Sequence, residues 1–104
     1  MSDVDFQFGD RIFKWDSEKA KLNKIKHGIG FKVAAQVFND DNRIERYDNK
    51  HSQAEDRWQV IGKVDEILFV VYTERKDYTR IISAREATDT EKGWYYGNGD
   101  IYFT

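Results

Sequence analysis

The chain has 104 residues, no cysteine and no proline, and a formal net charge of −2 at pH 7. The absence of cysteine excludes disulfides and thiolate metal sites, and no apolar run approaches the roughly 18 residues of a membrane span. The overall acidity excludes a uniformly basic nucleic-acid coat, although a local basic patch is compatible with it. We therefore expect one small domain over residues 1–104, located in the cytoplasm, since the first residues lack a signal-peptide pattern.

A strand and two helices are the first elements that the sequence predicts. Residues 11–15 alternate apolar and basic side chains, which is typical of a half-buried strand. Asp16 is the predicted N-cap of a helix that ends at Gly28, where we expect a left-handed C-cap. A shorter helix is predicted over 31–38. The apolar stripe that we expect the first helix to turn toward the core consists of Leu22, Ile25 and Ile29.

From residue 43 onward the pattern favours β structure, followed by one last helix. The continuous apolar run of 67–73 indicates a central strand that is covered on both faces. The final helix is predicted over 88–96 and stopped by Gly97, Asn98 and Gly99. The resulting order, β-α-α-β-β-β-β-α, predicts an α+β fold in which a mostly antiparallel sheet packs against helices. The four predicted strands of this half cover 43–47, 57–64, 67–73 and 78–85.

Basic residues concentrate in two segments of the chain. Residues 11–32 carry seven lysines and arginines against two acids, and residues 57–85 carry six against four. Arg57, Arg80 and Arg85 lie at predicted strand positions, where a rigid sheet could present their planar guanidinium groups to phosphate. Alternation predicts that Arg80 and Arg85 lie on opposite faces of the last strand. The alternative is ordinary ion pairing with neighbouring acids. The nearest of these acids are Glu55, Asp56, Glu74 and Glu86.

Neither a metal site nor a nucleotide cofactor is expected. The two histidines, His27 and His51, are far apart and have no carboxylate at a recognised ligand spacing. There is no nucleophile elbow and no glycine-rich phosphate loop. The first helix offers a partner surface, with Lys19 and Lys26 on the flank of its apolar stripe, which puts Lys26 at the edge of the core. For Lys19, Lys21 and Lys24 a solvated helix face is the favoured explanation. His27 in the last turn has two readings as well, a functional group or a residue favoured by the helix dipole.

Several short motifs, in this order and spacing, resemble the BrnT toxin family over residues 11–96. They are Phe13-Lys14-Trp15-Asp16-x-x-Lys19, Lys26-His27-Gly28-Ile29-x-Phe31, Ala34-Ala35-x-Val37-Phe38, Glu55-x-Arg57-Trp58-x-x-Ile61-Gly62, Val71-Tyr72-Thr73-Glu74-Arg75 and Arg80-Ile81-Ile82-Ser83-Ala84-Arg85-x-Ala87-Thr88-x-x-Glu91. The resemblance implies a RelE-like fold and a ribonuclease toxin of a type II toxin–antitoxin pair. It also implies a BrnA-like antitoxin partner, through which alone the complex would contact operator DNA.

The resemblance further implies cleavage of RNA without metal or cofactor, by attack of the 2′-hydroxyl on the adjacent phosphate. That reaction needs a base, cations for the developing charge and an acid. On the matching positions, Arg57 and Arg85 would stabilise the phosphate charge, Lys26 and His27 would transfer protons or contact substrate, and Glu74 is a candidate base. The residues expected to bind RNA are Arg75, Arg80 and Lys19.

Two features depart from the family pattern. Family members often have a strongly basic final helix, whereas residues 86–104 carry four acids and one lysine, which weakens the attraction of phosphate. Residues 1–10 lie outside the resemblance. The alternative to a nuclease is therefore a non-catalytic module that binds the antitoxin. A nuclease predicts that Arg57, Arg85 and Lys26 converge on one open concave face, whereas the binding module predicts that Glu55, Glu74 or Glu86 neutralise the arginines in buried pairs.

Overall fold

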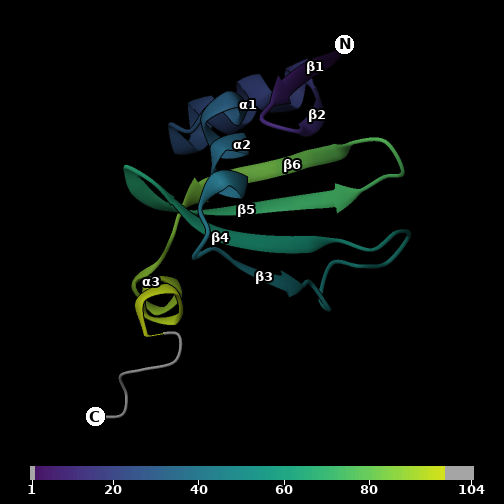
Figure 1. Ribbon diagram of the computed structural model, residues 1–104. Helices are drawn as coiled ribbons and strands as arrows, with labels where there is room; N and C mark the ends of the chain where they lie inside the picture. Colours follow the sequence, from purple (N-terminus) through teal and green to yellow (C-terminus); the bar gives the residue numbers. More distant parts are fainter. Residues whose placement is uncertain (1, 98–104) are drawn as a thin grey trace.

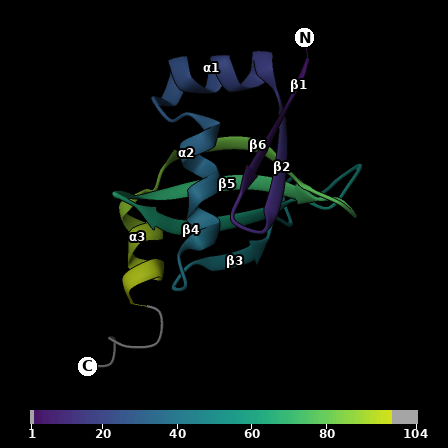
Figure 2. The same cartoon turned by 45° about the horizontal axis from the view of Figure 1, so that its top comes forward.

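A computed structural model describes residues 2–97 of the chain. These residues form a six-stranded sheet with helices on both faces (Figures 1 and 2). The strand order is β1-β2-β6-β5-β4-β3, and all neighbouring strands run antiparallel except β2 and β6, which are parallel. The strands are β1 (Asp3–Phe8), β2 (Arg11–Asp16), β3 (Ile44–Tyr47), β4 (Trp58–Val64), β5 (Glu66–Glu74) and β6 (Thr79–Glu86). The four strands of the C-terminal half thus lie within two residues of their predicted ranges.

Strand β1 was not predicted, so the observed element order begins with a hairpin and not with a single strand. β1 pairs with β2 from Asp3↔Asp16 to Phe8↔Arg11. The turn between them passes through Gly9 at φ +63°, a conformation that glycine adopts without strain. The sequence contains the signal of a half-buried strand, because apolar and polar residues alternate over Asp3–Phe8. In the structure the apolar residues are half-buried and the polar residues between them face solvent. These apolar residues are Val4, Phe6 and Phe8.

Helix α1 (Ser17–His27) has the predicted ends but not the predicted buried side. The Asp16 side chain accepts from the backbone N–H of Lys19, and Gly28 at φ 76° forms the left-handed C-cap, as expected. The prediction of a core-facing stripe is wrong, because Leu22 is 61% exposed and Ile25 73% exposed. The buried residue of this helix is Asn23.

The reason for this orientation is the edge of β6. β2 pairs with β6 only at Phe13↔Thr79 and Lys14↔Arg80, so the rest of that edge needs other hydrogen-bond partners. Asn23 supplies them, since its Nδ2 donates to the carbonyl of Ala84 (2.8 Å) and its Oδ1 accepts from the Ala84 N–H (3.1 Å). Backbone hydrogen bonding therefore selects the side of α1 that is buried.

The predicted helix over 31–38 is present as two shorter pieces that cover one face of the sheet. α2 (Phe31–Ala35) is followed directly by the 3₁₀ turn η1 (Gln36–Asn39). Figure 2 shows this segment running across β6, β5 and β4. We call this side of the sheet the helical face. The buried aromatic and aliphatic side chains of its core include Phe13, Trp15, Phe31, Phe38, Val60, Leu68, Val70 and Tyr72.

Helix α3 (Asp89–Tyr96) packs on the opposite face, at the end of the sheet where β4 ends and β5 begins (Figure 1). A second, smaller core lies under it and consists of Ile61, Ile67, Phe69 and Ala87, with Tyr95 packed against them. β5 is therefore covered on both faces along its first half, as its continuous apolar sequence predicted. Gly97 ends the helix, while Asn98 and Gly99 lie outside the described residues. No helix within residues 2–97 is long and apolar enough to cross a membrane.

Candidate functional site

The face opposite α2 collects basic side chains where α3 does not cover it. The prediction that Arg80 and Arg85 face opposite sides of their strand is wrong, because a bulge shifts the pairing of β6 with β5 at Val71/Tyr72. Arg85 pairs with Phe69 and Arg80 with Thr73, which lie four residues apart on the same face of β5. Lys14 pairs with Arg80, and Arg57 precedes β4 on the same side. We call this surface the basic face. Its cations are Lys14, Arg46, Arg57, Arg80 and Arg85.

Three of these cations are engaged by neighbours at the margins of the basic face. Two of the neighbours are acids of β1, since Asp3 accepts two hydrogen bonds from Arg80 (3.1 and 3.2 Å) and Asp5 lies 3.4 Å from Lys14. The hydrogen bonds from Arg80 lower the pKa of Asp3. The third cation, Arg46, stacks its guanidinium on the Trp94 ring at 4.1 Å.

Arg85 is held by a carboxylate of α3. Its two terminal nitrogens donate to the two oxygens of Glu91 at 2.8 and 2.9 Å, and its guanidinium stacks on the Phe69 ring at 4.1 Å. Glu91 also completes a capping box with Thr88, so the pair is built into the start of the helix. Although burial acts to raise it, the pKa of Glu91 is lowered by the hydrogen bonds from Arg85 and Thr88. Arg85 is therefore neutralised by Glu91, and not by one of the three acids that the binding-module hypothesis named, which are Glu55, Glu74 and Glu86.

Arg57 is the cation of the basic face whose guanidinium makes no ion pair, hydrogen bond or ring contact within residues 2–97. Its backbone N–H and carbonyl, in contrast, are both hydrogen-bonded. The Arg57 carbonyl accepts from the Asp48 N–H (2.9 Å), and the Arg57 N–H donates to Ser52 Oγ (2.8 Å). The side chain lines a hollow of about 260 Å³ together with His51, Gln53, Ala54 and Glu55. A fixed, unpaired guanidinium beside a hollow is suited to binding an anion.

Thr73 adds an unpaired acceptor and donor to this part of the face. It lies opposite Arg80 on β6, and continuing the register of β4 by one residue places Arg57 on its other side. Thr73 is 1% exposed, and its Oγ1 has no hydrogen-bond partner among the described residues. A buried hydroxyl without a partner costs about 1–3 kcal/mol, and this one lies between two arginines of the basic face.

The other residues singled out from the sequence do not join Arg57. Arg85 lies four residues further along the sheet, about 13 Å at the usual rise of a strand. Lys26 and His27 are exposed in the last turn of α1, and the Asn23–Ala84 contact puts that turn near the Arg85 end of β6. Lys26 is thus not at the edge of the core, and the expected convergence of Arg57, Arg85 and Lys26 is absent.

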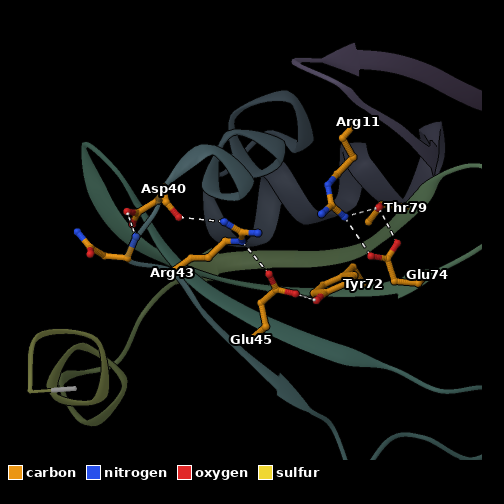
Figure 3. Close-up of polar contacts among 8 residues, drawn as sticks. Arg11, Asp40, Arg43, Glu45, Tyr72, Glu74 and Thr79 are labelled. Atoms are coloured by element: carbon orange, nitrogen blue, oxygen red, sulfur yellow. Dashed lines mark hydrogen bonds and ion pairs between the residues drawn. The ribbon is translucent and has the colours of Figure 1, made fainter. Parts of the chain in front are cut away.

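Glu74 and Arg75 are held in polar contacts at the turn between β5 and β6. Glu74 accepts from Arg11 (3.0 Å) and from Thr79 Oγ1 (2.8 Å), as Figure 3 shows. Because Glu74 follows Thr73 in the strand, it points to the helical face and away from Arg57. Arg75 donates to both oxygens of Glu55 (2.8 and 3.1 Å).

The same close-up shows a second polar group on the helical face, and Lys19 lies apart from both. Tyr72 donates its hydroxyl to Glu45 at 2.7 Å, and Arg43 donates to the other oxygen of Glu45 (Figure 3). Burial, followed by the contact with Glu45, raises the pKa of Tyr72. Lys19 is exposed in the first turns of α1. None of these groups reaches the basic face.

Sequence reasoning missed a contact between Asp48 and His51, because histidine was considered as a metal ligand. His51 Nδ1 lies 3.1 and 3.2 Å from the two oxygens of Asp48, and the His51 backbone N–H donates to the same carboxylate at 3.1 Å. The signal in the sequence was a histidine three residues after an aspartate in a polar loop. Within residues 2–97, no three histidine, aspartate or glutamate side chains are grouped to hold a metal ion.

Comparison with known proteins identifies the family of the chain. A family model described as "Ribonuclease toxin, BrnT, of type II toxin-antitoxin system" matches residues 15–91, from β2 into α3. The chain belongs to the BrnT family. The matched segment contains Arg57, Arg80 and Arg85 but not β1.

A solved structure supports the fold. The crystal structure of the ribonuclease toxin BrnT from Brucella abortus superposes with a TM-score of 0.55 and 24% sequence identity. The match covers 72% of this chain and 94% of the Brucella chain, and it shows the α+β fold with its mostly antiparallel sheet. None of the curated proteins matches the chain.

Proposed function

We propose that this BrnT-family protein is an endoribonuclease toxin with a RelE-like fold, acting in the cytoplasm, that cleaves RNA by attack of a 2′-hydroxyl on the adjacent phosphate without a metal ion. The observation that carries the proposal is the basic face. Arg57, Arg80 and Arg85 were selected from the sequence, and strand register puts all three on one side of the sheet. Arg57 among them has no acidic partner in the described part of the chain.

The reaction places different demands on these arginines. The phosphate gains negative charge as the 2′-oxygen adds, and a donor fixed before the reaction stabilises that charge best. Arg57 fits this role, because its backbone is anchored at both N–H and C=O and its guanidinium borders the hollow. Arg80 and Arg85 lie along the same face, where they would contact neighbouring phosphates. Lys26 and His27 would extend the contact beyond Arg85, whereas Glu74 points to the other face and is not supported as the base.

An antitoxin is the partner that a type II toxin family implies, and we propose that it is BrnA-like and binds α1. The exposed Leu22 and Ile25 lie on this helix, and a groove of about 560 Å³ runs beside it, lined by apolar side chains together with Lys21 and Lys24. The lysines at the groove favour an apolar segment flanked by acids. Operator DNA would then be contacted only through the antitoxin.

Cleavage of end-labelled RNA by the purified protein in EDTA tests the proposed activity. We expect products that end in a 2′,3′-cyclic phosphate, and Arg57→Ala should lower the rate about 100-fold or more, the scale of removing one charge-stabilising donor. Arg43→Ala is the matched control, because Arg43 pairs with Glu45 on the helical face (2.7 Å) and should leave cleavage unchanged. Arg85→Ala should also lower cleavage, but by less, because Glu91 already neutralises Arg85.

The second candidate function is a non-catalytic module that binds the antitoxin. The contact between Arg85 and the buried Glu91 favours it, because such a pair removes one cation of the basic face from RNA binding. Intact RNA after incubation with the folded protein, both with and without ribosomes, would select this module over the nuclease.

A further inference from the structure

We propose that His51 is the general base of the cleavage reaction, with Asp48 as the residue that positions it. This inference rests on the proposed ribonuclease function and adds the proton acceptor that the arginines do not supply. It starts from the loop between β3 and β4, in which Asp48 contacts His51 while His51 and Arg57 line one hollow.

The loop over 48–57 is closed by hydrogen bonds at its base. The Asp48 N–H donates to the Arg57 carbonyl at 2.9 Å, and Ser52 Oγ joins both ends by donating to the Asp48 carbonyl (2.6 Å) and accepting from the Arg57 N–H (2.8 Å). The positions of His51 and Arg57 are therefore linked through the backbone. Both residues line the same hollow of about 260 Å³.

The contact with Asp48 fixes the imidazole in the form that a base requires. Asp48 is 3% exposed, and its carboxylate faces His51 Nδ1 at 3.1 and 3.2 Å. Although burial acts to raise it, hydrogen bonds from the His51 backbone and from Gln59 lower the pKa of Asp48, so it is ionised at neutral pH. An ionised carboxylate at Nδ1 selects the tautomer that carries its hydrogen there, which leaves the lone pair on Nε2.

Nε2 is accessible, and the surrounding charges are accounted for. The His51 side chain is 59% exposed, and its Nε2 has no hydrogen-bond partner within residues 2–97. The charged groups around it are Asp48, which contacts its ring, and Glu55 and Arg57, which line the same hollow. Glu55 is paired with Arg75 at 2.8 Å, so Arg57 is the group left to bind a phosphate next to the imidazole.

These groups give a balanced reaction. Nε2 of His51 takes the proton of the 2′-hydroxyl while the 2′-oxygen forms its bond to phosphorus. The bond from phosphorus to the 5′-oxygen breaks, and that oxygen leaves with the electron pair and takes a proton from water. The imidazolium returns its proton to solvent, so the net change is transfer of one proton from the 2′-oxygen to the 5′-oxygen. Arg57 stabilises the charge on the non-bridging oxygens throughout.

His27 is the rival proton acceptor and is arranged differently. It is exposed at the end of α1, and no carboxylate contacts its ring in the described structure. An imidazole without an orienting partner samples both tautomers and many rotamers. The comparison of His51→Gln with His27→Gln therefore separates a positioned base from an exposed histidine.

The test measures cleavage of an end-labelled RNA in EDTA by the whole protein and by His51→Gln, His51→Ala and His27→Gln. We expect His51→Gln to lower kcat about 100-fold or more with little change in KM, the usual contribution of a general base. His27→Gln should have a smaller effect. Added imidazole should restore part of the activity of His51→Ala, which a role limited to loop structure would not produce. The pH profile of the wild-type rate should contain an ionisation that His51→Ala lacks.

The possible results distinguish the identity of the base from the proposed ribonuclease function itself. If His51→Gln unfolds at the wild-type temperature and cleaves within about threefold of the wild-type rate, His51 is not the base. If His27→Gln loses activity and His51→Gln keeps it, the base is on α1. Failure of the wild-type protein to cleave any RNA would instead overturn the proposed function itself. Asp48→Asn should lower kcat and shift the pH profile while leaving KM unchanged, as expected for a positioning residue.

Discussion

At the scale of single residues, the basic face differs from a simple cluster of arginines, because most of its cations are already occupied. Arg85 and Glu91 show the consequence most clearly. The Glu91 carboxylate satisfies the guanidinium of Arg85 and the backbone N–H of Thr88 with the same atom, Oε1. Glu91 thus caps the start of α3 and pairs with an arginine of β6. We infer that Glu91 acts mainly in stability and Arg57 mainly in substrate binding.

Glu91→Gln tests the stabilising role. The folded-state pKa of Glu91 is lowered from its ordinary 4.5, so the unfolded chain binds the proton more tightly than the folded one. Its contribution to stability is fully present above about pH 4.5 and is lost as the pH falls toward the folded-state pKa. We expect Glu91→Gln to lower the free energy of unfolding by about 2 kcal/mol at pH 7 and to make the decline below pH 5 shallower.

Urea unfolding at pH 7 and pH 4 measures both effects. Asp89→Asn is the matched control, because Asp89 lies in the same helix turn and pairs with no basic side chain in the part of the chain that the structure describes. It should cost about 0.5 kcal/mol at most. Equal losses in the two variants would show that only the helix dipole is involved.

At the scale of elements, the sequence predicted helix ends and strand positions well because local chemistry decides them. Asp16 and Gly28 cap α1 as expected, and Thr88 begins α3 with a full capping box. What failed was the orientation of α1, where a hydrophobic stripe pointed to the wrong side. The open edge of β6 is a long-range feature that one sequence does not reveal. Asn23 satisfies this edge by hydrogen bonding to the backbone of Ala84.

Two substitutions at adjacent positions test which side of α1 is buried, the side that carries Asn23 or the side that carries Leu22. Asn23→Leu adds an apolar side chain but leaves the N–H and C=O of Ala84 without partners, so we expect a loss of about 2–3 kcal/mol of unfolding free energy. Leu22→Asn affects a side chain that is 61% exposed and should cost about 0.5 kcal/mol, the difference in helix propensity. Thermal or urea unfolding of both variants decides the matter, and a larger loss for Leu22→Asn would restore the hydrophobic stripe as the buried side.

For the candidate site, the sequence likewise predicted some of the residues but not their arrangement. Arg57, Arg80 and Arg85 could be found as strand arginines, but alternation along the last strand predicts opposite faces for Arg80 and Arg85. The bulge that brings both to the basic face belongs to the pairing of β6 with β5, which one sequence does not reveal. The separation of Arg57 from Lys26 could not be predicted either, since it depends on α1 lying along the edge of β6. The partners Glu91 and Asp48 were also missed, because each lies in a helix start or a loop whose direction the sequence does not specify.

At the scale of the whole molecule, the acidic first strand explains how a chain with a net charge of −2 carries a basic face. β1 lies at the outer edge of the sheet and supplies Asp3 to Arg80 and Asp5 to Lys14. These contacts are exposed, so they stabilise the fold little. Their effect on RNA should be larger, because each acid occupies a cation that would otherwise meet a phosphate.

The double variant Asp3→Asn/Asp5→Asn should therefore bind single-stranded RNA more tightly than the wild-type protein. Freeing Arg80 and Lys14 adds two phosphate contacts, which should increase the slope of log affinity against log salt by about 1.4, at about 0.7 per contact. Asp10→Asn/Asp41→Asn changes the net charge by the same amount but removes exposed acids that pair with no cation in the described residues, so it should leave the slope unchanged. Binding measured by fluorescence anisotropy across a salt series distinguishes the two. Equal slopes for both variants would mean that net charge, and not the occupancy of the basic face by β1, sets the affinity for RNA.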